Sequence, residues 1–412
     1  MHIRNRFGLA GLLAFLTAAA PLAAAQAPPE HVALTGARVI PISGPPIDGA
    51  TILITRGKIA AIGEDVEVPF DARVFDVSDK VVMPGLVLAH TSRGTDRANE
   101  TRPVTPQLDV YDSIDPSQLF FEDTLRGGVT AVHVMPGNNT VIGGLGRVVR
   151  PIGLDLDEMT IAEGAFLKIA VGPRRGYDPM TQRAELRAAF LKHADALAKL
   201  AERRYEEQRE EDEKPLDVLP DEARKRGVKL IRAEDLDDEN RNLLRLTGGF
   251  VKVGDEAGDP ILPPLGAFVY CERAMDVGFA VQFAKDHGFF DRLVLVLGGE
   301  CYKAIDELKA AARPVVLPPD LLYRESDPIT GEVSETFVAK VFADAGLHFA
   351  LVPGPDTSLP ERLLTYQAAR CVRNGVPRDV ALRAITAWPA EMLGLGDRLG
   401  TLEVGKAAHL TV

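Results

Sequence analysis

Strand-like and helical segments alternate through most of this 412-residue chain. From Val81 onward, short apolar runs such as VVMPGLVLAH, GVTAVHVMPG, FLKIAVG and LVLVLGG are followed by stretches with helical periodicity. A strand, a helix and a further strand together build a parallel sheet with crossover helices. About eight such units close a barrel. We therefore predict an α/β fold with a (β/α)8 TIM-like barrel over residues 84–397. Its helices are expected at 116–126, 273–287, 300–312, 335–345, 359–374 and 377–393.

The two ends of the chain have a different pattern. Residues 26–83 hold short alternating strands separated by Gly, Pro and Asp turns, which is typical of a small all-β unit. The last stretch, GTLEVGKAAHLTV, returns to strand character. We expect residues 26–83 and 398–412 to form one composite β-sandwich. A charged helical insertion around 182–245 interrupts the barrel, either as a solvated surface helix, which we favour, or as a partner-binding helix.

The first residues have the pattern of a secretory signal peptide. Basic side chains at Arg4 and Arg6 precede the apolar stretch FGLAGLLAFLTAAAPLAAA, which ends in small residues suited to cleavage. We predict that residues 1–25 are removed on export. The mature chain is then expected in the periplasm or outside the cell, with no membrane attachment after cleavage.

Composition excludes some functions and favours others. The formal net charge is −12 and no basic patch is present, which argues against nucleic acid as a partner. Cys271, Cys301 and Cys371 are widely spaced and form no CxxC motif, so we expect buried free thiols. A small-molecule ligand or substrate is the partner that we expect. Whether the chain forms a homo-oligomer is left open.

Several longer motifs occur in a characteristic order. They are GKIAAIGEDVEVPFDARVFDVSDKVVMPGLVLAH, GVTAVHVMPGNNTVIGGLGRVV, LVLVLGGECYKAIDEL and LGLGDRLGTLEVGKAAHLTV. Together they resemble the amidohydrolase superfamily, in its imidazolonepropionase-like branch, over nearly all of the mature chain. The resemblance implies a barrel with a composite β-sandwich. It also implies hydrolysis of non-peptide C–N bonds by a metal-bound hydroxide, because zinc or a similar ion lowers the pKa of bound water to about 7.

The resemblance further implies a ligand set at the ends of the barrel strands, and most of that set is changed here. The family has His-x-His on strand 1, often a carbamylated Lys on strand 4, His on strands 5 and 6, and a proton-shuttling Asp on strand 8. The matching positions are His90 and Ser92 on strand 1, Lys168 on strand 4, Tyr270 and Glu272 on strand 5, Leu297 on strand 6, and Asp356 on strand 8.

Leu297 cannot bind a metal and Ser92 is a poor ligand for zinc, so we expect a degenerate site. It would hold no metal, or one weakly bound zinc-like divalent ion at His90, with Asp356 as the candidate catalytic residue. We expect Lys168 to stay an unmodified, positively charged ammonium that pairs with Asp356 and takes over the charge role of the missing metal. The other predicted pocket-lining residues are Ser92, Lys168, Tyr270, Glu272, Leu297, Asn138, Asn139 and Arg174.

Some of these positions have an alternative structural explanation. Asn138 and Asn139 could simply form a turn, and Arg174, the best positive charge for an anionic group, could simply be solvated. His133 and His348 are expected to be structural.

Three interpretations of function follow. The first is an amidohydrolase-related protein that is weak or inactive, a pseudoenzyme that binds a small ligand. The second is a hydrolase with a remodelled mononuclear metal site on His90 and Asp356. The third is a non-catalytic ligand-binding or partner subunit that uses the 182–245 insertion. We favour the first because of the lost ligands.

Overall fold

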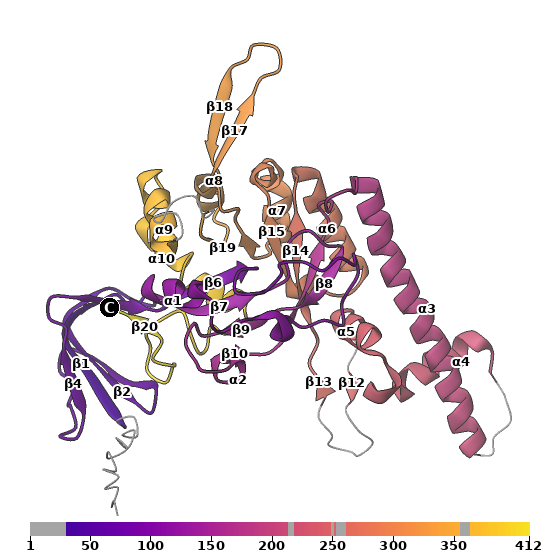
Figure 1. Cartoon of the computed structure of the whole chain (residues 1–412), viewed down its shortest axis with the longest axis horizontal. Coiled ribbons are helices and arrows are strands. Elements are labelled where there is room, and N and C mark those ends of the chain that lie inside the picture. Colours follow the sequence, from indigo (N-terminus) through magenta and orange to yellow (C-terminus); the bar gives the residue numbers. More distant parts are fainter. Residues whose placement is uncertain (1–29, 213–217, 249–250, 253–260, 355–362) are drawn as a thin grey trace, which may run out of the picture.

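The computed structural model describes residues 30–212, 218–248, 251–252, 261–354 and 363–412, which form a mixed α/β structure (Figure 1). The predicted signal peptide, residues 1–25, lies outside the described residues, and so does Asp356. Within the described part of the chain, no helix is both long and apolar enough to cross a membrane.

Both ends of the chain contribute to one six-stranded sheet, at the left of Figure 1. The final strand runs antiparallel to the fifth, with Leu410 opposite Pro84. A separate small core, which includes Val39, Ile52 and Leu402, lies against this sheet. The N- and C-terminal segments therefore share one unit, while the predicted domain boundaries stay predictions. The strands are β1 (His31–Val39), β2 (Ile47–Thr55), β3 (Lys58–Gly63), β4 (Arg73–Asp76), β5 (Val81–Pro84) and β20 (Leu410–Thr411).

Two further sheets form the wall of the barrel region. One has the order β10-β9-β7-β6 and the other the order β19-β16-β15-β14-β11-β8. From β11 to β19, neighbouring strands are parallel and follow chain order, as expected for repeated β/α units. The strands are β6 (Leu86–Thr91), β7 (Val129–Val134), β8 (Ile142–Leu145), β9 (Arg147–Val149), β10 (Thr160–Ala162), β11 (Phe166–Ala170), β14 (Gly266–Cys271), β15 (Leu293–Leu297), β16 (Val315–Val316) and β19 (Phe349–Ala350).

One part of this wall departs from the parallel pattern that we predicted. Strand β8 is antiparallel to β11, and β9 is antiparallel to β7, so one segment joins the two sheets. The connection from Val134 to Ile142 is too short to hold a crossover helix, so β7 and β8 do not form a parallel β/α unit and lie in different sheets. Gly146 stands between β8 and β9, where an added Cβ would lie 2.6 Å from the Nε2 atom of His133. A larger residue would not fit there.

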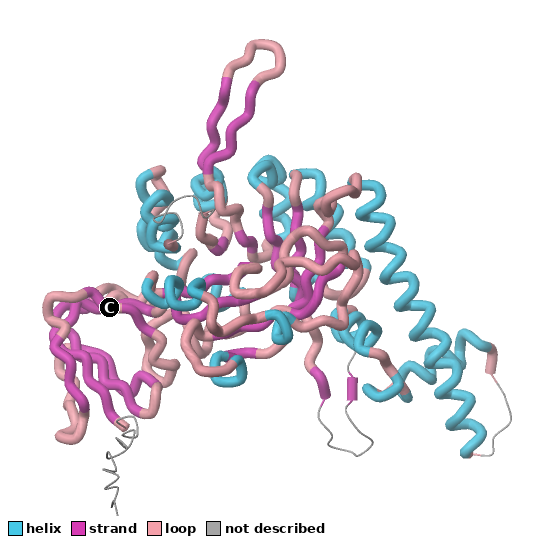
Figure 2. The backbone as a smooth tube through the Cα atoms, in the orientation of Figure 1, coloured by secondary structure: helices cyan, strands magenta, loops and turns pink. Residues whose placement is uncertain are grey.

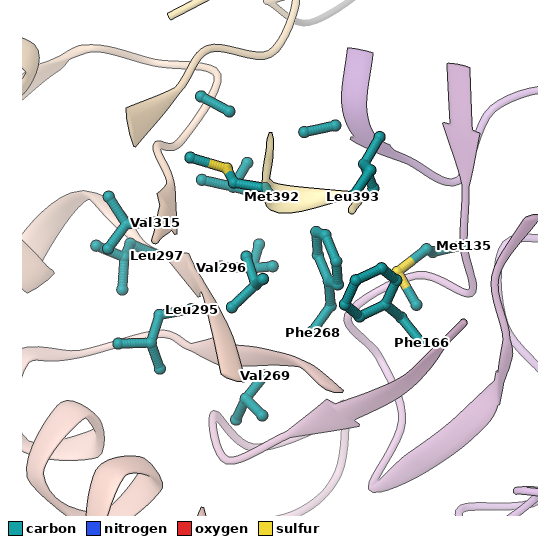
Figure 3. Close-up of a cluster of buried hydrophobic side chains, with 14 of the residues drawn as sticks. Met135, Phe166, Phe268, Val269, Leu295, Val296, Leu297, Val315, Met392 and Leu393 are labelled. Atoms are coloured by element: carbon teal, nitrogen blue, oxygen red, sulfur yellow. The ribbon is translucent and has the colours of Figure 1, made fainter. Parts of the chain in front are cut away.

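A loop segment fills the space between the first and last strands of the wall. The Leu351 N–H donates to the Ala384 carbonyl at 3.1 Å, and the Val87 N–H donates to the Ile385 carbonyl at 2.9 Å. The wall surrounds a large apolar core, part of which Figure 3 shows. That view includes Met135, Phe166, Phe268, Leu295, Val296, Leu297, Met392 and Leu393.

The helices lie close to their predicted positions. Three predicted helices start or divide differently: residues 299–304 form a 3₁₀ helix, η5, the stretch before Val338 is a strand, and a break separates α10 from α11. The helices around the wall are α1 (Leu119–Arg126), α2 (Leu156–Met159), α6 (Ala274–Asp286), α7 (Ile305–Ala311), α8 (Val338–Asp344), α9 (Leu364–Arg373), α10 (Arg378–Arg383) and α11 (Ala387–Met392).

The charged insertion forms an arm that extends away from the barrel wall (Figure 1). Ion pairs connect its helices, among them Arg204 with Asp235, and Lys192 with Glu239 at 3.1 Å. One face of α3 is buried, including Leu186, Phe190 and Leu200, and the opposite face is exposed. Whether the arm binds a partner stays open. Its helices are α3 (Pro179–Glu211), α4 (Pro220–Gly227) and α5 (Asp238–Leu246), followed by the short strands β12 (Val251–Lys252) and β13 (Ile261–Leu262).

A second projection is a hairpin of β17 (Leu322–Ser326) and β18 (Val333–Phe337), which stands out at the top of Figures 1 and 2. The sequence did not predict this hairpin. Its charged residues, such as the paired Arg324 and Glu335, interrupt the apolar alternation that marks a strand. Its base adjoins the candidate site.

Candidate ligand pocket at the barrel mouth

A cavity of about 490 Å³ lies at the carboxyl ends of the barrel strands. Functional sites in barrels of this kind are built at that end of the strands, and the volume is in the range of small-molecule sites. The residues that line it are His90, Asn138, Tyr270, Val296, Leu297, Gly298, Gly299, Val316, Leu317, Pro318, Pro319, Asp320, Leu322, Tyr323 and Val352.

A lysine–histidine pair forms the floor of this pocket. Lys168, in β11, has no exposed surface, and its Nζ atom lies 2.9 Å from His90 Nε2 and 2.7 Å from Asn138 Oδ1. Burial lowers the pKa of Lys168 to about 7. Burial, and then the charge of Lys168, holds the pKa of His90 well below its usual value. Both groups are therefore uncharged above neutral pH.

Aromatic side chains support this pair from below. His133, in β7, is buried; its Nδ1–H donates to the Ala89 carbonyl at 2.9 Å, and its ring meets Phe166 and Phe268 edge-on. The His90 ring stacks on Phe268 with centroids 6.1 Å apart. Burial lowers the pKa of His133 to about 4. These contacts indicate a packing role for His133.

Tyr270 and Leu297 line the pocket from neighbouring strands, β14 and β15. Burial, followed by the nearby Glu272 carboxylate, raises the pKa of Tyr270 to about 12. The phenol therefore stays protonated. Lys168 Nζ lies 6.0 Å from the centre of the Tyr270 ring. Leu297 brings no metal-binding atom to the site.

The described side chains do not fit a metal centre. Among the residues that the structure describes, no group of three or more His, Cys, Asp and Glu side chains could hold a metal ion. Whichever atom donates in the His90–Lys168 hydrogen bond, the Nε2 atom of His90 is already engaged. The predicted metal role of His90 therefore lacks supporting ligands here. Because Asp356 lies outside the described residues, its pairing with Lys168 or His90 stays a prediction.

Of the predicted pocket-lining residues, Asn138, Tyr270 and Leu297 line the cavity. The other five do not, and they are Ser92, Lys168, Glu272, Asn139 and Arg174. Lys168 lies beneath the cavity. The Ser92 carbonyl accepts from the Thr95 hydroxyl in the loop after β6.

Glu272, Asn139 and Arg174 contact neighbouring loops instead of the cavity. The Glu272 N–H donates to Asp276, and Asn139 Oδ1 accepts from the Arg175 N–H at 2.6 Å. Arg174 donates to the Thr101 carbonyl at 3.2 Å and lies over the Tyr177 ring. The role of Arg174 in ligand binding stays a prediction.

Sequence reasoning missed one wall of the pocket. Asp320, Leu322 and Tyr323 come from the segment after β16, at the base of the hairpin. The run VVLPPDLLY did mark a strand end, and that was the available signal. His348, expected to be structural, stacks on Trp388 with ring centroids 4.4 Å apart.

Comparisons with known proteins agree with this fold. No protein-family model matches the chain. Amidohydrolase tasK of Hapsidospora irregularis is 25% identical over 403 residues, covering 88% of this chain; the chain spans only 37% of that relative. The crystal structure of an amidohydrolase from Thermotoga maritima matches with a TM-score of 0.70 and 26% identity, covering 92% of this chain and 93% of that one. A structure of molinate hydrolase, with a TM-score of 0.48 and 16% identity, is too distant to support an argument.

Proposed function

We propose that this chain is a member of the amidohydrolase superfamily, that its barrel mouth binds a small molecule, and that the Lys168–His90 pair takes the place of the family's metal centre. The fold is that of a C–N hydrolase. The replaced ligands support a metal-dependent reaction that is weak or absent in this chain.

The contact between Lys168 Nζ and His90 Nε2, at 2.9 Å, carries the proposal. A histidine binds a metal through a free lone pair on a ring nitrogen, and this nitrogen already has a hydrogen-bond partner. The neighbouring strands bring Tyr270, which stays a phenol, and Leu297 to the pocket. An uncharged pair at the floor needs no counter-ion, and so it satisfies its polar atoms without a metal.

The direct test combines metal content, mass and hydrolysis. The protein is purified without chelator, its metals are measured by elemental analysis, and a panel of amides is screened for hydrolysis. We expect far less than one zinc per chain, an unmodified Lys168 by mass, and no hydrolysis above that of a His90→Ala variant. Stoichiometric zinc with a carbamate on Lys168 would overturn the proposal, since an uncharged amine can also take up carbon dioxide. One zinc per chain that is lost in His90→Ala would support the mononuclear hydrolase instead.

A pair of engineered variants tests whether the pocket corresponds to the family's metal position. Ser92→His combined with Leu297→His restores two imidazoles beside His90, and we expect this variant to gain zinc binding by calorimetry. Ser92→Phe combined with Leu297→Phe adds rings of similar size without a lone pair and should gain none. A folded double-histidine variant that takes up no zinc would show that the correspondence is wrong.

Export is a separate part of the proposal. The basic start, the apolar stretch and the small residues before Gln26 support removal of residues 1–25. N-terminal sequencing of the exported protein should begin near Gln26, and an intact Met1 would contradict this.

A further inference from the structure

We infer that the pocket at the barrel mouth takes an uncharged ligand that carries a ring and a carbonyl group, and that it excludes carboxylates and phosphates. This inference rests on the proposed function, in which the mouth is a ligand site without a metal. It names the chemical class of the ligand for that site.

The wall of the pocket is mainly apolar and aromatic. Two tyrosine rings, Tyr270 and Tyr323, offer flat surfaces to a ligand, and an edge-on contact with Tyr302, at 5.5 Å between centroids, supports Tyr323. Transferring an anion from water into such surroundings without a cationic partner is costly. The apolar members of the wall are Val296, Leu297, Val316, Leu317, Pro318, Pro319, Leu322 and Val352.

Two lysine side chains close to the mouth have other partners. Lys168 is covered by His90 and Asn138 and has no exposed surface. Lys303 pairs with Glu325 at 2.6 Å and lies 5.4 Å from the centre of the Tyr323 ring. Among the described residues that line the pocket, none is a lysine or an arginine. An anionic ligand would therefore meet no cation on the described walls.

Among the described lining residues Asp320 is the one carboxylate, and it does not make the pocket a cation site. The side chain of Asp320 is 71% exposed and lies 3.9 Å from the guanidinium of Arg370. An exposed charge is screened by water and salt, so its pull on a ligand deeper in the pocket is small. Asp320 therefore belongs to the rim.

The remaining polar groups suit a neutral carbonyl. Because Asn138 Oδ1 accepts from Lys168, the amide NH₂ of Asn138 is the group left to donate. The Tyr270 phenol is a second donor in the same pocket. Two neutral donors beside flat aromatic surfaces match a ring-bearing amide, ester or ketone.

Three probes that share one ring system test the charge preference. They are naphthamide, naphthoate and naphthylmethylammonium, and their binding to the full chain is followed by saturation-transfer NMR. We expect naphthamide to bind about tenfold or more tightly than naphthoate, which corresponds to roughly 1.4 kcal/mol. Equal or tighter binding of naphthoate would overturn the inference, and so would tighter binding of naphthylmethylammonium or no binding of any probe.

A charge placed in the wall should reverse the preference. Tyr323→Arg adds a cation to the pocket, so we expect naphthoate to gain affinity and naphthamide to lose it. Ser326→Arg adds the same charge further along the hairpin, outside the lining residues, and should leave the preference unchanged. Thermal melts show whether each variant is folded. A folded Tyr323→Arg variant that still rejects naphthoate would show that the probes bind outside this pocket, and it would overturn the inference.

Metal analysis separates this inference from the proposed function. Stoichiometric zinc together with a preference for naphthamide would remove the proposed function and leave the ligand class standing. Absence of zinc together with a preference for naphthoate would remove the ligand class alone.

Discussion

Gln182 and Gln367 hold different loops of the barrel mouth in the same way. Both side chains are fully buried, and each Nε2 group donates to two backbone carbonyls around the mouth. Gln182 binds the carbonyls of Thr140 and Ala170, both at 2.8 Å. Gln367 binds those of Pro319 and Val352, at 2.8 and 3.2 Å. The loops around the pocket are thereby fixed to α3 and α9.

Replacing either glutamine with methionine keeps the volume and removes both donors. We expect Gln182→Met and Gln367→Met each to lower the free energy of unfolding by about 2 kcal/mol, the scale for stranding buried carbonyls. The two share no partner, so the double variant should show additive loss. Urea unfolding measures this, with the exposed Gln282→Met as a near-neutral control. A single variant as stable as the parent would show that water replaces the lost donors.

The parallel part of the fold was predictable because its strands are continuous apolar runs. All five residues of Leu293–Leu297 are buried, which is the pattern of a strand covered on both faces. Strand ends of parallel sheets meet at one edge, so His90, Tyr270 and Leu297 could be expected in one pocket, where the structure has them. For the antiparallel β8–β9 segment, the sequence shows only that the stretch between Val134 and Ile142 is too short for a crossover helix.

Other contacts could not be read from residue order. Lys168 was expected to reach toward Asp356, but among the described residues its Nζ contacts His90 and Asn138. That choice depends on how the loop after β7 folds back over the floor. Arg174 was predicted from its charge alone; its backbone N–H donates to the Gln182 side chain, and its guanidinium donates to the Thr101 carbonyl, both at 3.2 Å. The sequence pattern predicts the strand, whereas the packing of the loops decides which groups a side chain contacts.

The buried amine makes stability depend on alkaline pH. The pKa of Lys168 falls from its usual 10.5 to about 7 in the folded chain. Between these values the unfolded chain binds a proton that the folded chain does not, so stability rises with pH by up to roughly 1.4 kcal/mol per unit. Lys168→Met removes this gain.

We therefore expect the destabilisation caused by Lys168→Met to be larger at alkaline pH than at neutral pH. Comparing the two proteins cancels most other titrating groups. Urea unfolding of both proteins across this range measures the difference. A constant difference between them would show that Lys168 is charged in the folded state, as a pair with Asp356 would require.

Because His133 is buried beneath the pair, the stability of the protein should depend on pH in the acidic range. The pKa of His133 is lowered from 6.5 to about 4 by burial, so the folded chain resists a proton that the unfolded chain accepts. Stability is then lost as pH falls from about 6.5 toward 4. His90, whose pKa is also lowered, adds to the loss. We expect His133→Phe to be about 1–2 kcal/mol less stable at neutral pH, because the Ala89 carbonyl loses its donor.

As pH falls from neutral toward 4, the His133→Phe variant should lose less stability than the parent protein. Unfolding curves from neutral to mildly acidic pH, followed by the fluorescence of Trp388, measure this. An unchanged acid dependence would mean that His133 accepts its proton in the folded state.

An arginine of the insertion arm supports the end of β14 through a buried carboxylate. Asp276 is 1% exposed; it pairs with Arg183 at 2.8 Å and accepts from the backbone N–H groups of Glu272 and Arg273. Removing one partner of such a pair leaves a buried charge without compensation, so we expect Arg183→Met to cost about 3 kcal/mol. Arg187 lies over the same Phe279 ring, at 5.2 Å against 4.8 Å for Arg183, and within the described part of the chain no ion pair is seen for it. Arg187→Met should therefore cost well under 1 kcal/mol, roughly the scale of an exposed cation–π contact. Equal effects of the two substitutions in urea unfolding would show that stacking on Phe279, and not the ion pair with Asp276, attaches the arm to the barrel.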